Sequence, residues 1–91
     1  MFKTLEELIE VIRNRKESSL KESYTSKLLK NKKLSVEKIK EEIAELIEAT
    51  EKDENKVHEA ADVLYHLMVL LEANGIKIED VMDELKKRQK W

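Results

Sequence analysis

The chain has 91 residues, no cysteine, and 20 acidic against 18 basic residues, which give a net charge of -2. This balance excludes a general electrostatic attraction to nucleic acid or anionic lipid, and the lack of cysteine excludes disulfides and thiolate metal ligands. We expect residues 1–91 to form one domain. Because a domain this short buries only roughly 60–65% of its unfolded surface, we also expect it to form a homodimer.

Two features of the sequence bear on where the protein works. The N-terminal segment Met1–Glu7 carries acidic residues where a secretory signal needs a basic start and an apolar core. The longest nearly apolar run, residues 60–71, is too short for a bilayer span of about 20 residues. The sequence therefore predicts a cytoplasmic protein that does not cross a membrane.

With no proline and one glycine, the chain predicts an all-α fold. Four main helices and one short helix are expected, forming a helical bundle that dimerisation completes. The first helix should begin at Thr4, because residues 4–7 have the form of a capping box, and should end near Ser18. Residues 23–29 form either a short helix capped by Ser23 or a loop.

The later helices carry clearer boundary signals. Ser35 is a good N-cap and predicts the start of the third helix. The fourth helix is expected over about residues 53–74, and Asn74-Gly75 supplies a left-handed C-terminal cap. A fifth helix should start at about Ile78, with acidic residues in its first turn and basic residues in its last, as the helix dipole favours.

The third and fourth predicted helices each carry two acidic residues spaced three apart. Glu42 and Glu45 lie beside the apolar stripe of the third helix, and taken alone such a pair is more often a solvated edge. Glu59 directly precedes the nearly apolar run, and Asp62 lies within it. An ionised carboxylate there costs several kcal/mol unless it is paired or metal-bound. Two such pairs on antiparallel helices suit a divalent ion. Magnesium fits because it takes few carboxylates and commonly binds substrate phosphates.

These acids also carry a family resemblance. The pattern Glu42-x-x-Glu45 followed by Glu59-x-x-Asp62 resembles the metal-binding signature of the all-α nucleotide pyrophosphohydrolase superfamily. Over essentially its whole length the chain is similar to the phosphoribosyl-ATP pyrophosphohydrolase family. The similarity rests on residues 23–29, 38–42 and 59–71, Gly75-Ile76 and Asp80-Val81. The chain departs from the family pattern at Lys40 and in residues 31–33, where the family usually has glycine, and only the loop before the third helix is affected.

The resemblance implies an enzyme of histidine biosynthesis that uses Mg²⁺ to hydrolyse phosphoribosyl-ATP to phosphoribosyl-AMP and pyrophosphate. It implies four metal ligands: Glu42, Glu45, Glu59 and Asp62. Glu42 and Glu41 are the catalytic candidates, although the position of Glu41 on the helix favours plain exposure. The candidates for binding the nucleotide are Ser23, Tyr24, Thr25, Lys27 and Lys38.

Other interpretations of these residues stay open at this point. The hydroxyls of Ser23 and Thr25 serve equally well as helix caps, and both lysines serve equally well as surface residues. His66, four residues after Asp62, is more often a structural partner than a ligand. The same metal site also suits another, non-standard or deoxy nucleoside triphosphate. A helical dimerisation domain with merely solvated acids is the third alternative, and it predicts no magnesium binding.

Overall fold

The computed structural model describes residues 1–17 and 23–91, and within these ranges all regular structure is helical. The helices are α1 (Lys3–Glu17), α2 (Tyr24–Lys30), α3 (Lys32–Lys52), α4 (Lys56–Ala73) and α5 (Ile78–Lys87). This confirms the predicted all-α class, with α2 as the short helix. In the described ranges no helix is both long enough and apolar enough to cross a membrane. The predicted end of the first helix near Ser18 lies outside the described residues.

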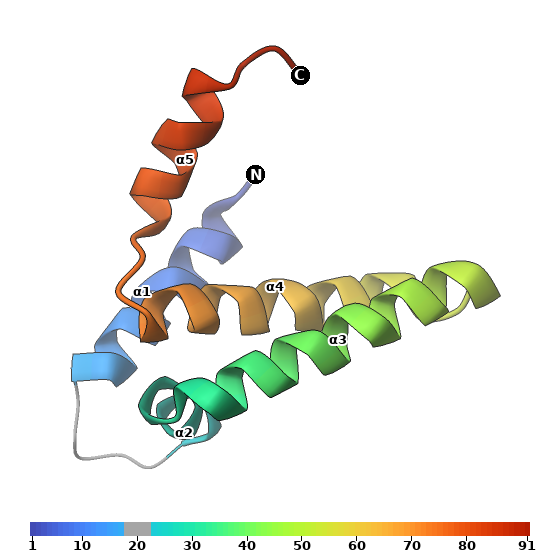
Figure 1. Ribbon diagram of the computed structural model, residues 1–91, viewed down its shortest axis with the longest axis horizontal. Coiled ribbons are helices and arrows are strands. Elements are labelled where there is room, and N and C mark those ends of the chain that lie inside the picture. Colours follow the sequence, from blue (N-terminus) through green and yellow to red (C-terminus); the bar gives the residue numbers. More distant parts are fainter. Residues whose placement is uncertain (18–22) are drawn as a thin grey trace.

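The arrangement of the helices centres on α4. Helices α3 and α4 run antiparallel along the longest axis of the molecule, and α1 and α2 pack against the C-terminal half of α4 (Figure 1). The buried core joins Ile12 of α1, Leu28 of α2, and Met68 and Val69 of α4. Full burial of each such side chain stabilises the fold by about 1.5–3 kcal/mol. Among the described helices, only α3 accompanies the N-terminal half of α4, so these two helices extend beyond the core as a two-helix arm (Figure 1).

Helix α3 begins earlier than predicted. Its N-cap is Asn31, whose Oδ1 accepts a hydrogen bond of 3.0 Å from the Leu34 N–H. The prediction that Ser35 caps this helix is wrong, because Ser35 is buried inside α3 and its Oγ donates to the Leu28 carbonyl at 2.6 Å. The Asn31 N–H also closes the end of α2, so one residue separates the two helices. Helix α1 likewise begins at Lys3, one residue before the predicted Thr4.

The turn between α3 and α4 consists of three polar residues. Asp53 and Asn55 both adopt the left-handed conformation, with φ of 57° and 52°, which short polar side chains tolerate better than most. Because these residues cannot continue a right-handed helix, α4 begins at Lys56 and the predicted start near Asp53 is wrong. The turn reverses the chain and places the first turns of α4 beside the last turns of α3.

The C-terminal end of α4 follows the prediction. Gly75 has a φ of 69°, which a residue with a β-carbon rarely adopts. Its N–H donates to the Glu72 carbonyl at 3.1 Å, and the Ile76 N–H donates to the Leu71 carbonyl at 2.9 Å. This pair of hydrogen bonds is the Schellman motif. It turns the chain out of α4 and into α5.

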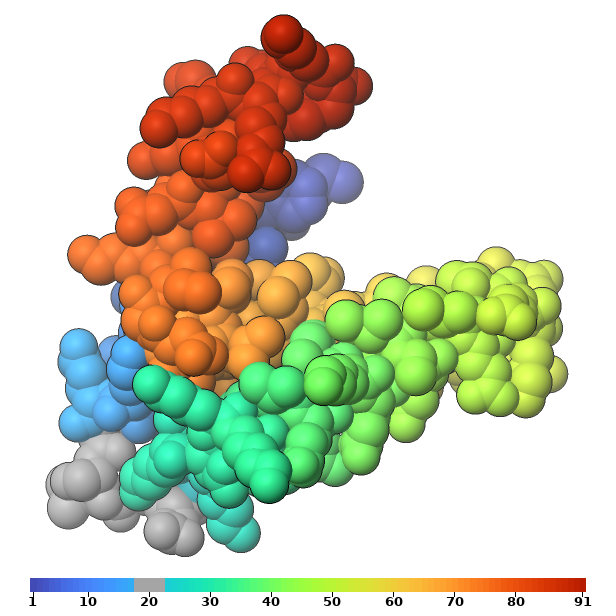
Figure 2. All heavy atoms as spheres, viewed as in Figure 1, coloured from blue at the N-terminus to red at the C-terminus, as the bar shows by residue number. Residues whose placement is uncertain are grey.

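Helix α5 is attached to the body mainly at its N-terminal end. Ile78 packs against the core, and Arg13 of α1 donates to both carboxylate oxygens of Glu79, at 3.0 and 2.5 Å. None of the residues of α5 is buried. In the space-filling view α5 stands away from the rest of the molecule (Figure 2). Its start near Ile78 agrees with the prediction.

The attachment of α5 should depend on pH. The hydrogen bond from Arg13 lowers the pKa of Glu79 from 4.5 to about 2. A depressed carboxyl pKa stabilises the fold above pH 4.5, and this contribution is lost as the pH falls through about 2. We therefore expect Glu79→Gln to lower Tm at pH 7 and to have a much smaller effect near pH 2. Thermal melts at both values check this, with Glu84→Gln as the control because Glu84 of α5 pairs only locally, with Arg88 at the C-terminal cap of the same helix.

Candidate active site

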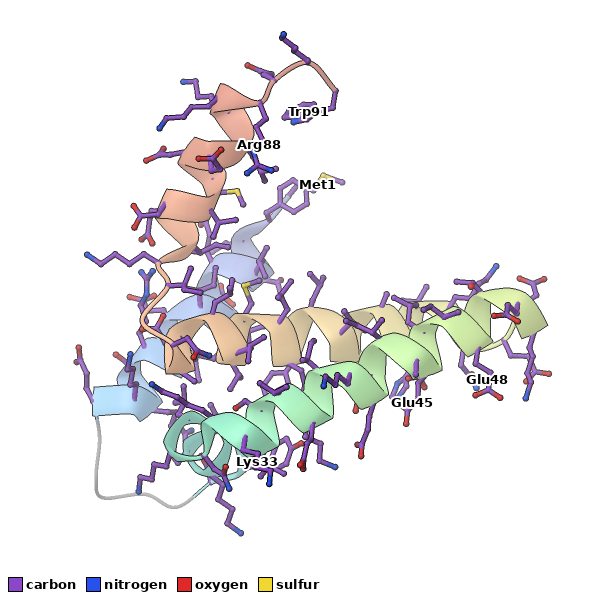
Figure 3. The ribbon with its side chains drawn as sticks, viewed as in Figure 1. Met1, Lys33, Glu45, Glu48, Arg88 and Trp91 are labelled. Carbon is purple, nitrogen blue, oxygen red and sulfur yellow. The ribbon has the colours of Figure 1, made fainter. Side chains whose placement is uncertain are left out.

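The four acidic residues predicted as ligands lie together where α3 and α4 face each other. Glu42 and Glu45 come from α3, and Glu59 and Asp62 come from α4. One carboxylate oxygen from each can be chosen so that all four atoms lie within 4.8 Å of one another. The three-residue spacing puts each pair on one face of its helix, and the antiparallel arrangement brings the two faces together. Figure 3 shows Glu45 on α3, with Glu48 farther along the helix.

The environment of this carboxylate cluster, defined as Glu42, Glu45, Glu59 and Asp62, is short of hydrogen-bond donors. Among the described residues, Glu42 Oε2 and Glu59 Oε2 are shielded from solvent and have no hydrogen-bond partner. Burial raises the pKa of Glu42, and the neighbouring charge of Glu45 raises it further. The pKa of Glu59 is raised by burial and by Glu45. Buried carboxylate oxygens without donors are costly, so the cluster is suited to a cation.

The donor set indicates which cation would fit. The four residues offer only carboxylate oxygens, the ligands that hard divalent ions such as Mg²⁺ prefer. Glu42 on α3 and Glu59 on α4 each have a carboxylate oxygen without a hydrogen-bond donor among the described residues, so an ion between the helices could be coordinated from both sides. The residues present therefore fit a magnesium ion.

A fifth residue, His58, borders the cluster and was not among the predicted site residues. Its Nε2 lies 3.4 Å from Asp62 Oδ2, and it forms a second candidate ligand group with Glu59 and Asp62. His58 is largely exposed, whereas Asp62 is about half-buried. The signal was in the sequence, because His58 precedes Asp62 by four residues and the two share a helix face.

Glu41 and Lys38 lie beside the cluster rather than in it. Lys38 Nζ donates to Glu41 Oε2 at 3.3 Å, and this hydrogen bond raises the pKa of Lys38. Tyr24 and Glu42 raise the pKa of Lys38 further. The side chain of Glu41 is mostly exposed, as its position on the helix favoured.

The candidates on and next to α2 have different surroundings. Ser23 is the N-cap of α2, and its Oγ accepts from the Ser26 N–H at 3.1 Å. The hydroxyl of Thr25 is hydrogen-bonded to that of Tyr65 on α4. The hydroxyl of Tyr24 lies 3.0 Å from Nε2 of the buried His66. Lys27 is exposed on α2. The structure therefore shows Ser23 in its capping role and places Tyr24 and Thr25 against α4.

Comparison with known proteins identifies the family. A family model described as Phosphoribosyl-ATP pyrophosphohydrolase matches residues 5–89. The helical fold and its paired carboxylates thus define a pyrophosphohydrolase domain. The chain belongs to the phosphoribosyl-ATP pyrophosphohydrolase family, which confirms the resemblance seen in the sequence.

Individual relatives show how much of each protein the chain covers. A phosphoribosyl-ATP pyrophosphatase from Methanoculleus marisnigri is 44% identical over 91 residues, 94% of each chain. One from Pyrobaculum arsenaticum is 43% identical over 94 residues, 97% of each chain. The histidine biosynthesis bifunctional protein HisIE of Pyrococcus furiosus is 47% identical over 87 residues, which cover 94% of this chain but 41% of that protein. The chain thus spans less than half of the bifunctional relative and nearly all of the other two.

Proposed function

We propose that the chain hydrolyses phosphoribosyl-ATP to phosphoribosyl-AMP and pyrophosphate, as a step of histidine biosynthesis. Membership of the family and the names of the relatives support this activity. The observation that carries the proposal is the carboxylate cluster, in which two shielded oxygens lack hydrogen-bond donors. A hydrolase acting on a polyphosphate needs such a centre to offset the charge of its substrate.

In this proposal the four carboxylates hold Mg²⁺. Bound there, magnesium supplies Lewis acidity toward the phosphate oxygens and toward the attacking water. The chain itself contributes the placement of the acids on two facing helices and the positive charge of Lys38 next to them. Lys27 is the second candidate for offsetting phosphate charge.

The assignment of a catalytic base stays a prediction. Glu42 belongs to the cluster and its Oε2 has no donor among the described residues, so it can accept a hydrogen bond from a water molecule. Glu41 is the second candidate for positioning the water. In this geometry its carboxylate instead accepts from Lys38, so we favour Glu42 for this role.

We also propose that the chain works as a homodimer. Its accessible surface is 7173 Å², whereas a folded monomer of 10.7 kDa is expected to expose about 5,500 Å². Stable interfaces bury about 800 Å² per partner, so the surplus is large enough for one. Exposed apolar side chains form a stripe on α3, consisting of Val36, Ile43 and Ile47. Val63 and Leu70 on α4 are partly buried within the chain.

The oligomeric state can be measured directly. Light scattering of the chain at micromolar concentration should give twice the mass of one chain. Ile47→Lys, which puts a charge on the apolar stripe of α3, should shift the protein toward the monomer because an unpaired charge in an interface is costly. A monomeric mass for the unsubstituted protein would contradict the homodimer.

The proposed activity is tested by substrate competition. Phosphoribosyl-ATP and a panel of standard, non-standard and deoxy nucleoside triphosphates are incubated with the protein, with magnesium or with a chelator, and released pyrophosphate is quantified. We expect magnesium-dependent release from phosphoribosyl-ATP. Release only from another nucleotide would mean that the protein carries out the same hydrolysis on a different substrate. Release from none would favour a non-enzymatic helical dimerisation domain.

A further inference from the structure

His66 has a hydrogen-bond partner at each ring nitrogen. It is buried in α4, and its Nδ1 lies 2.9 Å from the backbone carbonyl oxygen of Asp62. A carbonyl oxygen only accepts, so Nδ1 must carry the proton. In the neutral ring Nε2 is then an acceptor. To this neutral ring, the Tyr24 hydroxyl, 3.0 Å from Nε2, donates its single proton.

The direction of this hydrogen bond determines what Tyr24 can do. Once its proton is used by His66, the Tyr24 oxygen can only accept hydrogen bonds from its other side. The residue as a whole is 48% exposed, so a ligand can reach Tyr24 from solvent. It also lies next to the turn of α4 that carries Asp62, because the hydroxyl contacts His66 Nε2 and His66 Nδ1 is hydrogen-bonded to the Asp62 carbonyl.

The surrounding rings restrict the movement of Tyr24. The His66 ring meets the Tyr24 ring edge-on, with centroids 5.9 Å apart, and the Tyr65 ring edge-on at 5.0 Å. Tyr65 in turn is hydrogen-bonded to Thr25, the residue after Tyr24. Two neighbouring residues of α2 are thus anchored to two neighbouring residues of α4. Such anchoring holds a side chain in one orientation before a ligand arrives.

We infer that His66 is a positioning residue for the proposed hydrolysis, and that it holds the Tyr24 oxygen toward the substrate as a hydrogen-bond acceptor. The inference rests on the proposed function for its substrate. An acceptor is matched by a donor, so the group that meets Tyr24 is a hydroxyl or amino group of the nucleotide. A phosphate oxygen, which is also an acceptor, does not fit.

Variants at position 66 separate the two hydrogen bonds of the ring. His66→Asn keeps a donor near the Nδ1 position but loses the acceptor for Tyr24. His66→Gln keeps an acceptor near the Nε2 position but loses the donor to Asp62. We expect Tyr24→Phe and His66→Asn each to lower kcat/KM about tenfold, mostly by raising KM. His66→Gln should restore most of the loss, and the double variant should be no worse than either single variant.

A modified substrate shows which group of the nucleotide donates the hydrogen bond to Tyr24. With a 2′-deoxy analogue of phosphoribosyl-ATP, Tyr24→Phe should cost nothing if the 2′ hydroxyl is the donor. The tenfold cost should persist if another hydroxyl or an amino group is the donor. Unchanged kcat/KM in Tyr24→Phe with the natural substrate would overturn the inference. Independent, multiplying effects of Tyr24→Phe and His66→Asn would overturn it as well.

A readout that needs no activity keeps this inference distinct from the proposed function. Nitrogen-15 NMR of the substrate-free, unsubstituted protein reports which ring nitrogen of His66 carries the proton. We expect the proton on Nδ1, and Tyr24→Phe should change the signal of Nε2 but leave the proton on Nδ1. A proton on Nε2, with or without one on Nδ1, would overturn the inference whatever the enzyme does. An inactive protein with the expected NMR signals would instead refute the proposed substrate.

Discussion

Asp62→Asn is expected to lower magnesium-dependent release of pyrophosphate by at least about a hundredfold. The amide has nearly the same shape as the carboxylate but removes one charged ligand from the cluster. The metal-free protein should be as stable as before or slightly more stable, because Asp62 adds to the repulsion that acts on Glu42 and Glu59. Steady-state kinetics and urea unfolding in chelator measure the two effects.

A matched control for this variant lies on α3. Glu48→Gln also replaces an acid by its amide, but Glu48 is exposed and pairs with Lys52 on the same helix, outside the cluster. It should leave activity unchanged and alter stability by less than about 0.5 kcal/mol. If Asp62→Asn instead markedly destabilised the metal-free protein, Asp62 would serve the stability of the fold, with His58, whose Nε2 lies 3.4 Å from Asp62 Oδ2, as its partner.

Magnesium should raise the thermal stability of the protein. An ion that binds only the folded state at a hundred times its Kd stabilises that state by about 2.7 kcal/mol. For a domain of this length, this corresponds to a rise in Tm of roughly 10–20 °C. Relief of the repulsion within the cluster is the physical source of the effect. Calorimetry with magnesium and with chelator measures it.

The same experiment separates specific binding from a general salt effect. Glu42→Gln and Asp62→Asn should each remove most of the magnesium-dependent rise, whereas Glu48→Gln should keep all of it. Potassium chloride at equal ionic strength should have no comparable effect. Screening by salt weakens the repulsion between the carboxylates far less than an ion bound among them does. An equal Tm with magnesium and with chelator would exclude the carboxylate cluster as a metal site.

Local signals in the sequence were enough to predict the cluster. The spacing within each acid pair depends only on the 3.6-residue period of a helix, and Asn74-Gly75 ended α4 as expected because few other residues adopt a positive φ. The start of α3 could not be derived in this way. Asn31 and Ser35 are equally good caps, and the choice depends on where α2 ends, since Asn31 closes one helix and opens the next.

The roles of the ring residues could not be predicted from the sequence for a different reason. The spacing of four residues between Asp62 and His66 places both on one helix face, but the partner of Nε2 comes from α2, 42 residues away. Only the packing of α2 on α4 decides whether Tyr24 meets this nitrogen. The surroundings of Glu41 likewise depended on which rotamer Lys38 adopts.

The hydrophobic core of the described residues includes no residue of α4 before Tyr65, so the two-helix arm that carries Glu45, Glu59 and Asp62 lies largely beyond it. Segments with few buried apolar contacts open at a lower free energy than the core does. An ion held between the two helices would act there as a cross-link, joining them at the point where the core no longer does. The carboxylate cluster would then also hold the two helices of the arm together. Slow hydrogen exchange of the backbone amides in the arm would report on whether the ion is bound.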